Sequence, residues 1–260
     1  DEISTSEEMK NEFISSVSHE LRTPLTAIKG WCETLMTLED TDVDRKMRQK
    51  GLQVIDNETE RLSMMVEELL DFSRIQNGKL TLVKTNIDIL AELGEAVLIY
   101  EERARRDGIE LLYREPEYLS PVFGDKNRLR QVFINIIDNA LKYSDAGGRV
   151  TVEAVENDGI ISITVTDTGC GIAKEDLPKV KTKFYKANTT RRGSGIGLAV
   201  ANEIVMMHDG DLLIDSELNV GTTVTVRLPA SGRKNESKKT EITSTMEFKI
   251  PEGSDGKEEA

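Results

Sequence analysis

The sequence of 260 residues contains little of what several common protein classes require. Its only two cysteines, Cys32 and Cys170, lie far apart, so we expect reduced thiols and neither a disulfide framework nor a structural zinc site. No apolar run approaches the ~18 residues that are needed to span a bilayer. No basic start followed by an apolar stretch indicates a signal peptide. These absences predict a cytoplasmic chain that makes no direct membrane contact of its own.

Positive charge is also scarce, since 34 Lys and Arg residues stand against 47 Asp and Glu residues, for a formal net charge of -13. Proteins that bind nucleic acid usually carry a basic surface, so we expect no nucleic-acid partner. Docking on anionic lipid is disfavoured for the same reason. Because the chain begins at Asp1 and not at a methionine, we expect it to be part of a longer protein, which a missing N-terminal region could anchor in a membrane.

Residues 1–77 carry two long helical patterns, which the polar stretch 39–42 separates. In the first, the apolar side chains fall within about a third of the helical wheel; they are Phe13, Val17, Leu21, Leu25, Ile28, Trp31, Cys32 and Leu35. The second has heptad spacing and contains Leu52, Ile55, Thr59, Leu62, Val66, Leu69 and Ser73. Because two helices bury too little apolar surface by themselves, we expect a helical hairpin that dimerises into a four-helix bundle.

Residues 78–230 predict a second domain, of the α+β class. Helical patterns at 87–106, 126–143 and 195–208 alternate with strand-like runs at 149–155, 160–166, 211–215 and 222–228, which are rich in Val, Ile and Thr. We expect an α/β sandwich in which helices cover one face of a mostly antiparallel sheet. Residues 231–260 contain thirteen charged and only five apolar residues, which predicts a disordered polar tail.

The chain has only two histidines, His19 and His208. His19 lies opposite the apolar stripe of its helix and should face solvent, as should Thr23 one turn later. A lone exposed histidine commonly has no function, but here Glu20 is adjacent and Pro24 is expected to kink the helix nearby. An exposed imidazole beside a carboxylate suits a nucleophile that a mobile partner must reach. His208 is instead explained by a turn and a charge–dipole contact at the end of a helix.

Polar residues follow one face of the expected helix 126–143. Asn135 and Asn139 are four residues apart, and Lys142 and Tyr143 follow within one more turn. Two carboxamides at this spacing can direct oxygens at one metal–phosphate cluster, and a nearby lysine supplies positive charge. The same residues could also form no more than the solvated face of an amphipathic helix.

Two glycine-rich segments lie further along the chain. Asp167 comes directly after a strand and precedes Gly169 and Gly171, so its carboxylate can accept from an exocyclic amine while the backbone approaches a planar ligand closely. The second segment, 191–198, opens a helix and contains Gly193, Gly195 and Gly197. Glycine-rich backbone at a helix N-terminus is an anion site, although a flexible turn has the same pattern. The segment matches neither the Walker nor the Rossmann fingerprint.

The run from Phe13 to Leu25, with His19, Glu20, Thr23 and Pro24 inside it, resembles the H box of two-component sensor histidine kinases. The segments around Asn135, Asp167 and Gly193 are similar, in type and order, to the N box and the two glycine boxes of the gyrase–chaperone–kinase–MutL ATPase superfamily in its histidine-kinase version. The resemblance covers about residues 5–230. At one position the sequence departs from it: Lys181 stands where the family usually has the first of two phenylalanines, whereas Phe184-Tyr185 keeps the second.

The resemblance implies an ATP-dependent protein-histidine kinase that uses Mg²⁺. In it, His19 attacks the γ-phosphate of ATP through Nε2, while Glu20 hydrogen-bonds Nδ1 and accepts its proton. The phosphoryl group then passes to an aspartate on the receiver domain of a response regulator. The resemblance also implies that Thr23 orients a water for dephosphorylation of the regulator, although this residue could instead only cap the kink before Pro24.

The resemblance further implies a role for each residue of the nucleotide site. Asn135 would ligate Mg²⁺, Asn139 and Lys142 would contact the phosphates, and Tyr143 would lie beside the nucleotide. Asp167, with Gly169 and Gly171, would bind the adenine amino group. Gly193, Gly195 and Gly197 would form the junction of lid and helix over the triphosphate. Thr222-Thr223, which follow Gly221, resemble the last element of the family's nucleotide site.

Two other classes have to be weighed against a homodimeric histidine kinase. One is a conformational ATPase of the same superfamily, such as a chaperone or a mismatch-repair protein, but those proteins lack a phosphoacceptor helix. The other is a dimeric scaffold that binds ATP without transferring its phosphate, and the presence of Asn135, Asp167 and His19 argues against it.

Overall fold

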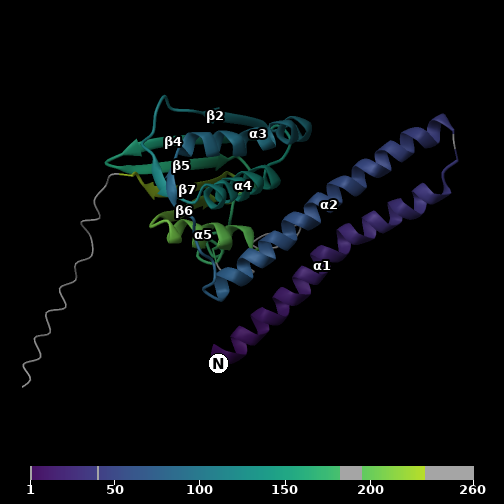
Figure 1. Ribbon diagram of the computed structural model, residues 1–260, viewed down its shortest axis with the longest axis horizontal. Coiled ribbons are helices and arrows are strands. Elements are labelled where there is room, and N and C mark those ends of the chain that lie inside the picture. The colour runs from purple at the N-terminus through teal and green to yellow at the C-terminus, as the bar shows by residue number, and fades with distance from the viewer. Residues whose placement is uncertain (1, 40, 182–194, 232–260) are drawn as a thin grey trace, which may run out of the picture.

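The computed structural model describes residues 2–39, 41–181 and 195–231. They form a long helical hairpin and an α/β domain that lies beside the second helix of the hairpin (Figure 1). Among these residues, no helix combines the length and the apolar character needed to cross a membrane. Residues 232–260, which are predicted to be a disordered tail, lie outside the described part of the chain.

The hairpin consists of α1 (Glu2–Thr37) and α2 (Asp42–Gln76). Helix α2 begins after Thr41, whose hydroxyl accepts a hydrogen bond from the backbone N–H of Asp44 at 3.1 Å. Helix α1 continues through Pro24, so the kink expected there does not end the helix. Near the connecting turn the two helices touch, because a Cβ on Gly51 would lie only 2.7 Å from the indole of Trp31. The predicted helical hairpin is therefore present.

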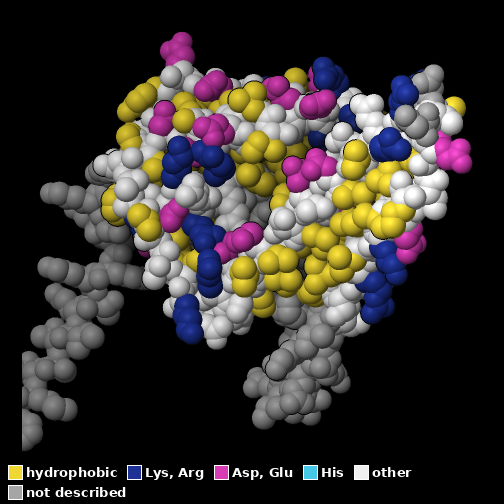
Figure 2. All heavy atoms as spheres, turned by 45° about the vertical axis from the view of Figure 1, so that its right-hand side comes forward, with side chains coloured by type: hydrophobic (Ala, Val, Ile, Leu, Met, Phe, Trp, Pro, Cys, Tyr) yellow, Lys and Arg dark blue, Asp and Glu magenta, His cyan; other side chains and the backbone are white. Residues whose placement is uncertain are grey.

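A single hairpin leaves much of its apolar stripe uncovered. Leu25 of α1 is 54% exposed, and Leu52 and Val66 of α2 are 55% and 45% exposed. In Figure 2, where the hairpin end comes forward, hydrophobic side chains gather on the exposed surface. Isolated exposed apolar residues are common, but several along one stripe of a helical hairpin require an additional surface to cover them.

The α/β domain is built on a five-stranded sheet in the order β2-β4-β5-β7-β6. All neighbouring strands are antiparallel except β2 and β4, which are parallel. The strands are β2 (Glu110–Arg114), β4 (Arg149–Asn157), β5 (Ile160–Asp167), β6 (Asp211–Glu217) and β7 (Gly221–Pro229). A separate two-stranded sheet pairs β1 (Thr85–Ile87) with β3 (Val122–Gly124). The predicted mostly antiparallel sheet is confirmed.

Three helices pack on this sheet (Figure 1), namely α3 (Ile89–Asp107), α4 (Lys126–Tyr143) and α5 (Gly197–Met207). Alternate residues of β4 and β5 are buried beneath them, as the period-2 pattern predicts. Asp158 and Gly159 between these strands have φ values of 51° and 70°, as a two-residue type I′ hairpin requires. The sequence patterns predicted all elements but the short strands β1, β2 and β3.

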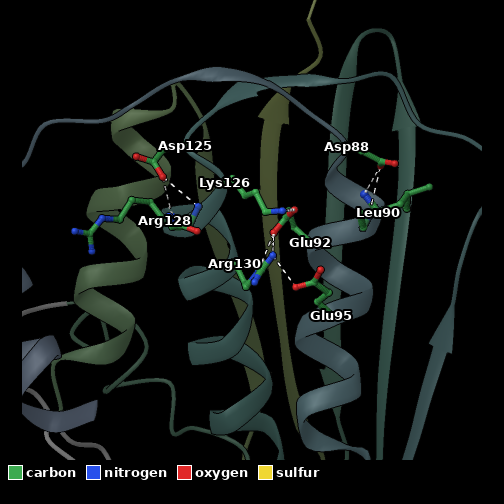
Figure 3. A network of polar contacts seen from close by, with 10 residues as sticks. Asp88, Leu90, Glu92, Glu95, Asp125, Lys126, Arg128 and Arg130 are labelled. Atoms are coloured by element: carbon green, nitrogen blue, oxygen red, sulfur yellow. Dashed lines mark hydrogen bonds and ion pairs between the residues drawn. The ribbon is translucent and has the colours of Figure 1, made fainter. Parts of the chain in front are cut away.

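A buried carboxylate sets the position of α3 against α4 (Figure 3). Glu92 of α3 is 3% exposed and accepts from Arg130 of α4 at 2.8 and 2.6 Å, and Lys126 lies 3.1 Å away. Arg130 also contacts Glu95, which stands at the surface. Two cations around one buried carboxylate offset the cost of removing it from water.

His208 joins the end of α5 to the start of α4. The ring is 1% exposed, its Nε2 accepts from the backbone N–H of Asp125 at 2.9 Å, and its Nδ1 lies 2.7 Å from the Ile204 carbonyl oxygen, to which it must donate. Burial lowers the pKa of His208, and Lys84 adds to this, whereas Asp125 and Asp209 oppose it. The charge–dipole contact expected from the sequence is therefore wrong: a neutral imidazole is held by two backbone groups.

The ion cluster predicts a large difference between two neighbouring glutamates. Glu92→Gln should lower the free energy of unfolding by about 3–5 kcal/mol, because Arg130 and Lys126 would lose their buried counter-charge. Glu95→Gln, the matched control at the surface, should cost no more than about 1 kcal/mol. Urea unfolding of the two variants measures both values. If both variants lose the same free energy of unfolding, the buried position of Glu92 has no special role.

The buried imidazole predicts a pH dependence of stability. The unfolded chain binds a proton at His208 near its ordinary pKa of about 6.5, but the folded chain does so only at lower pH. The contribution of His208 is therefore complete above about pH 6.5 and is lost as the pH falls toward the folded pKa. The free energy of unfolding of the wild type should exceed that of His208→Gln by more at pH 7.5 than at pH 5. If the difference in unfolding free energy between the two proteins does not change with pH, this explanation is contradicted.

Candidate active site

His19 lies exposed on α1, as the helical wheel predicts. An open hollow of about 390 Å³ next to it is lined by α1 alone, through His19, Arg22, Thr23, Thr26 and Ala27. Thr23 is half-buried, and its hydroxyl donates to the carbonyl oxygen of His19 at 3.2 Å. The hydroxyl thus lies one turn from the imidazole and satisfies a backbone acceptor just before Pro24.

Glu20 points away from the exposed face of α1. The residue is 8% exposed, and its carboxylate accepts from the Arg61 guanidinium of α2 at 3.3 Å. Arg61 also lies 3.6 Å from Glu58. Successive side chains of a helix diverge by about 100°, so a residue next to an exposed histidine can face the partner helix. The contact between Glu20 and Arg61 thus joins α1 to α2. The hydrogen bond from His19 Nδ1 to Glu20 stays a prediction.

Helix α4 presents the carboxamides opposite its buried face. Asp125 caps its first turn by accepting from the backbone N–H groups of Asn127 and Arg128 at 3.1 and 3.2 Å. Asn135 donates through Nδ2 to the carbonyl oxygen of Gly197 at 3.2 Å, which joins α4 to the first residue of α5. Its carboxamide oxygen therefore remains for a cation or a water, one turn before Asn139.

Positive charge is placed at the C-terminal end of α4. The Lys142 ammonium lies 4.8 Å from the centroid of the Tyr143 ring. Burial lowers the pKa of Lys142, while the carboxylates of Asp138, Glu20 and Glu68 raise it. Two of these carboxylates belong to the hairpin, so this end of the predicted nucleotide site is close to the segment that carries His19.

Asp167 ends β5 in a largely buried position. Its Oδ1 accepts from the backbone N–H groups of Gly169 at 2.8 Å and Thr222 at 3.3 Å. Burial raises the pKa of Asp167, and these two hydrogen bonds oppose the rise. Because both of these hydrogen bonds use Oδ1, the second oxygen of the carboxylate is available to a donor such as a ring-bound amine.

Close backbone approaches explain the glycines after Asp167. A Cβ on Gly169 would lie 2.3 Å from the carbonyl oxygen of Tyr143, and one on Gly171 would lie 2.0 Å from that of Glu217. Gly171 also has a φ of +64°, which side chains disfavour. The loop is therefore pressed between the end of α4 and the turn after β6, which brings Tyr143 next to Asp167.

Most of the remaining predicted site residues lie around this loop. Thr223 of β7 has its hydroxyl 3.2 Å from that of Thr166, and Gly195 has a φ of +71° just before α5. The Lys181 ammonium donates to the carbonyl oxygen of Leu212 on β6, a contact that a phenylalanine could not make. Gly193 and the pair Phe184-Tyr185 lie outside the described residues.

The structure adds one hydroxyl that sequence reasoning missed, that of Ser216 on β6. Ser216 accepts from the backbone N–H of Ile172 at 2.8 Å, and its oxygen lies 2.9 Å from the Thr222 hydroxyl. Ser216 and Ile172 are 44 residues apart, and Ser216 belongs to no distinctive local pattern, so only the fold brings the two together.

The donor set restricts the kind of metal this site could hold. Within the described part of the chain, no three His, Cys, Asp or Glu side chains are grouped so that they could bind an ion. Mg²⁺ commonly takes one or two protein oxygens and completes its octahedron with phosphate oxygens and waters. The Asn135 carboxamide oxygen fits that mode of binding.

Comparison with known families matches both parts of the chain. Residues 9–78 match the His Kinase A (phospho-acceptor) domain, and residues 124–232 match the histidine kinase-, DNA gyrase B- and HSP90-like ATPase family. The first match contains α2 and most of α1, and the second contains α4, α5 and the Asp167 loop.

Individual relatives agree with these matches. The sensor histidine kinase WalK of Bacillus subtilis is 36% identical over 226 residues, which are 85% of this chain and 36% of WalK. The structure of ShkA in complex with AMPPNP matches with a TM-score of 0.62 at 27% identity, over 83% of this chain and 45% of ShkA. Histidine kinase ThkA in complex with the response regulator TrrA matches with a TM-score of 0.62 at 23% identity, over 85% of this chain and 61% of that one, which shows a shared fold. The chain thus spans about a third of WalK.

Proposed function

The chain belongs to the sensor histidine kinases of two-component systems, and from this membership we propose that it phosphorylates its own His19 with ATP and passes the phosphoryl group to a response regulator. The observation that carries the proposal is the exposed imidazole of His19, which lies in an H-box segment of a chain that also holds the Asp167 loop. The experiment that tests it is labelling of His19 by ATP.

His19 is the proposed nucleophile. Its neutral imidazole would attack through Nε2, so that an N–P bond forms while the bond from the γ-phosphorus to the bridging oxygen breaks and ADP leaves. The Nδ1 proton would pass to Glu20. In the structure the Glu20 carboxylate accepts from Arg61 at 3.3 Å, and this contact would stabilise its ionised form until it takes up the proton.

The nucleotide would be held by side chains from α4 and the Asp167 loop. Asp167 would accept from the adenine amino group, Tyr143 would lie beside the base, and Asn139 and Lys142 would contact the phosphates. Asn135 would hold Mg²⁺, whose charge stabilises the negative charge that builds up on the phosphates. In phosphoryl transfer the protein chiefly aligns the reactants and stabilises their charge. The burial of Asp167 and Lys142 supports a role of these two residues in holding the nucleotide.

The two parts of the chain would divide this work. We assign dimerisation and the phosphoacceptor to residues 1–77, and ATP binding to residues 78–230. The exposed Leu25, Leu52 and Val66 support a homodimer, because a second hairpin would cover them. A receiver domain of the regulator would dock at the hollow around His19. ATP and such regulators are found in the cytoplasm, where we place this part of the protein.

Thr23 supports a second activity toward the same partner, removal of the phosphoryl group from the regulator. Its hydroxyl lines the hollow beside His19 and could position a water at an aspartyl phosphate. Its hydrogen bond to the His19 carbonyl equally fits a residue that only completes the helix before Pro24. The two roles differ in their consequence for dephosphorylation.

The phosphoacceptor assignment predicts a single site of labelling. Incubation with γ-labelled ATP should give an acid-labile, base-stable phosphoprotein, and His19→Gln should abolish the label while ATP binding is unchanged. His208→Gln is the matched control and should keep the label, because its ring is buried and bound to two backbone groups. Label that persists in the His19 variant would refute the assignment.

The adenine contact predicts a loss of affinity. Asp167→Asn should weaken ATP binding by roughly 10- to 100-fold, because a hydrogen bond to a charged group contributes about 1.5–3 kcal/mol. Asp211→Asn removes an exposed carboxylate from β6 and should leave the affinity unchanged. Calorimetric titration measures both. An unchanged dissociation constant for Asp167→Asn would remove this residue from the site.

The proposed dephosphorylation predicts a selective defect. Thr23→Ala should keep autophosphorylation within a few-fold of wild type but lose most dephosphorylation of purified phospho-regulator, because the hydroxyl that orients water is gone. Thr23→Ser keeps a hydroxyl and should retain the activity. If the alanine variant dephosphorylates the regulator as fast as wild type, Thr23 only completes the helix.

A further inference from the structure

Asp71 is a buried carboxylate of the hairpin whose partners belong to the other part of the chain. It lies on α2, is 1% exposed, and accepts through Oδ2 from Arg128 at 2.5 Å and from Gln131 at 2.8 Å. Both partners lie in the first two turns of α4. Arg74, one turn away on α2, approaches the other oxygen at 3.8 Å. A buried carboxylate needs such partners, so Asp71 holds the start of α4 against α2.

Apolar packing strengthens the same contact. Leu69, Phe72 and Ile75 of α2 are partly buried and pack against the hydrophobic core of the α/β domain. The last turns of α2 run beside α5 (Figure 1). Asp71 therefore lies within an apolar contact that excludes water, where its hydrogen bonds are directional and fix the orientation of α4.

The segment that connects the two parts is bound to the α/β domain. Leu80 is buried, the backbone N–H of Val83 donates to Asp125 Oδ2 at 2.9 Å, and the Lys84 ammonium donates to the Met207 carbonyl oxygen at 2.7 Å. Asp125 also caps α4 through its other oxygen. The domain is thus attached closely to the end of its own α2, which limits its reach toward the hairpin of a second chain.

From Asp71, α4 extends back toward the middle of the hairpin. Arg128 and Lys142 are fourteen residues apart, about 21 Å along a helix, and Asp71 and Arg61 are ten residues apart, about 15 Å. The carboxylates of Glu20 and Glu68 raise the pKa of Lys142, and Arg61 lowers it, so the far end of α4 lies within electrostatic reach of these residues. Helix α4 therefore leads from its contact with Asp71 toward the turn of the hairpin that carries His19, within one chain.

We propose that Asp71 is a positioning residue that docks the ATP-binding domain on the hairpin of its own chain, so that His19 receives the phosphoryl group from the nucleotide held by the same chain. This inference rests on the proposed function. The bonds change as described for autophosphorylation: Nε2 of His19 gains the phosphorus, ADP leaves with the bridging oxygen, and the Nδ1 proton passes to Glu20. A docked domain places the reacting groups before reaction begins, which raises the rate without tighter binding of ATP.

Mixed dimers of the full 260-residue chain test the direction of transfer. Wild type with one tag is co-expressed with the double variant His19→Gln/Asn135→Ala, which carries a second tag, and the mixed dimer is isolated through both tags. Each wild-type chain should take up as much label from γ-labelled ATP as in the wild-type dimer. In a mixed dimer of His19→Gln with Asn135→Ala, neither chain should be labelled.

Transfer between chains gives the opposite pattern and would overturn the proposal: label on the Asn135→Ala chain, and none on wild type beside the double variant. If no mixed dimers form, the two chains of each pair are joined through a flexible linker into one polypeptide and judged by the same labels. A wild-type dimer that takes up no label would instead refute the proposed function itself.

Variants of Asp71 test the positioning role. Asp71→Asn should lower kcat for autophosphorylation at least tenfold while KM for ATP is unchanged, and Asp71→Glu should restore part of the rate. Glu67→Gln, an exposed carboxylate one turn away on α2, should behave as wild type. An unchanged or increased kcat, or a change in KM alone, would contradict the role. If Asp71→Asn does not fold, Arg128→Met removes the same hydrogen bond from the other side and is judged by the same criteria.

Discussion

The candidate active site depends on the amphipathic character of α4. Its apolar face must be buried against the sheet and the neighbouring helices, and Leu129, Val132, Phe133 and Ile136 are accordingly between 0% and 2% exposed. Because a helix has 3.6 residues per turn, burial of this face directs Asn135, Asn139 and Lys142 to the other side. A substitution that rotated α4 would therefore disturb the core and the nucleotide site together.

Next to α4, backbone groups and close backbone contacts determine the conformation of the Asp167 loop. Asp167 is positioned by backbone N–H groups from its own loop and from β7, and Gly169 and Gly171 allow the loop to touch two carbonyl oxygens at distances that exclude a side chain. Such contacts hold the carboxylate in one orientation before a ligand arrives. Binding of a ligand therefore costs little conformational entropy of the protein, because the loop is already ordered.

The hairpin has a different construction, in which the side chain proposed as phosphoacceptor lies on the surface. His19 and its hollow stay accessible, while Glu20 is turned toward Arg61 and the apolar stripe is only partly covered. A helix that is continuous through Pro24 can hold an imidazole rigidly and still expose it to the nucleotide and the regulator proposed as its partners. The buried Asp71 connects the hairpin to α4, so on our proposal the position of the nucleotide relative to His19 depends on this contact.

Local sequence by itself determined the helical hairpin, the exposure of His19, the four long strands and the amphipathic α4, because each follows from a periodic pattern or a motif within one element. It could not show that Glu20 faces Arg61 or that His208 is buried and neutral, since a helical wheel does not say which neighbour covers a face. It also missed the Ser216 hydroxyl, the three-residue strands β1 and β3, which are too short for a pattern, and β2, whose residues do not alternate clearly between buried and exposed. Only the tertiary structure decided that Asp71 meets Arg128 and Gln131, because these residues lie 57 and 60 positions apart and come together only when α4 packs beside α2.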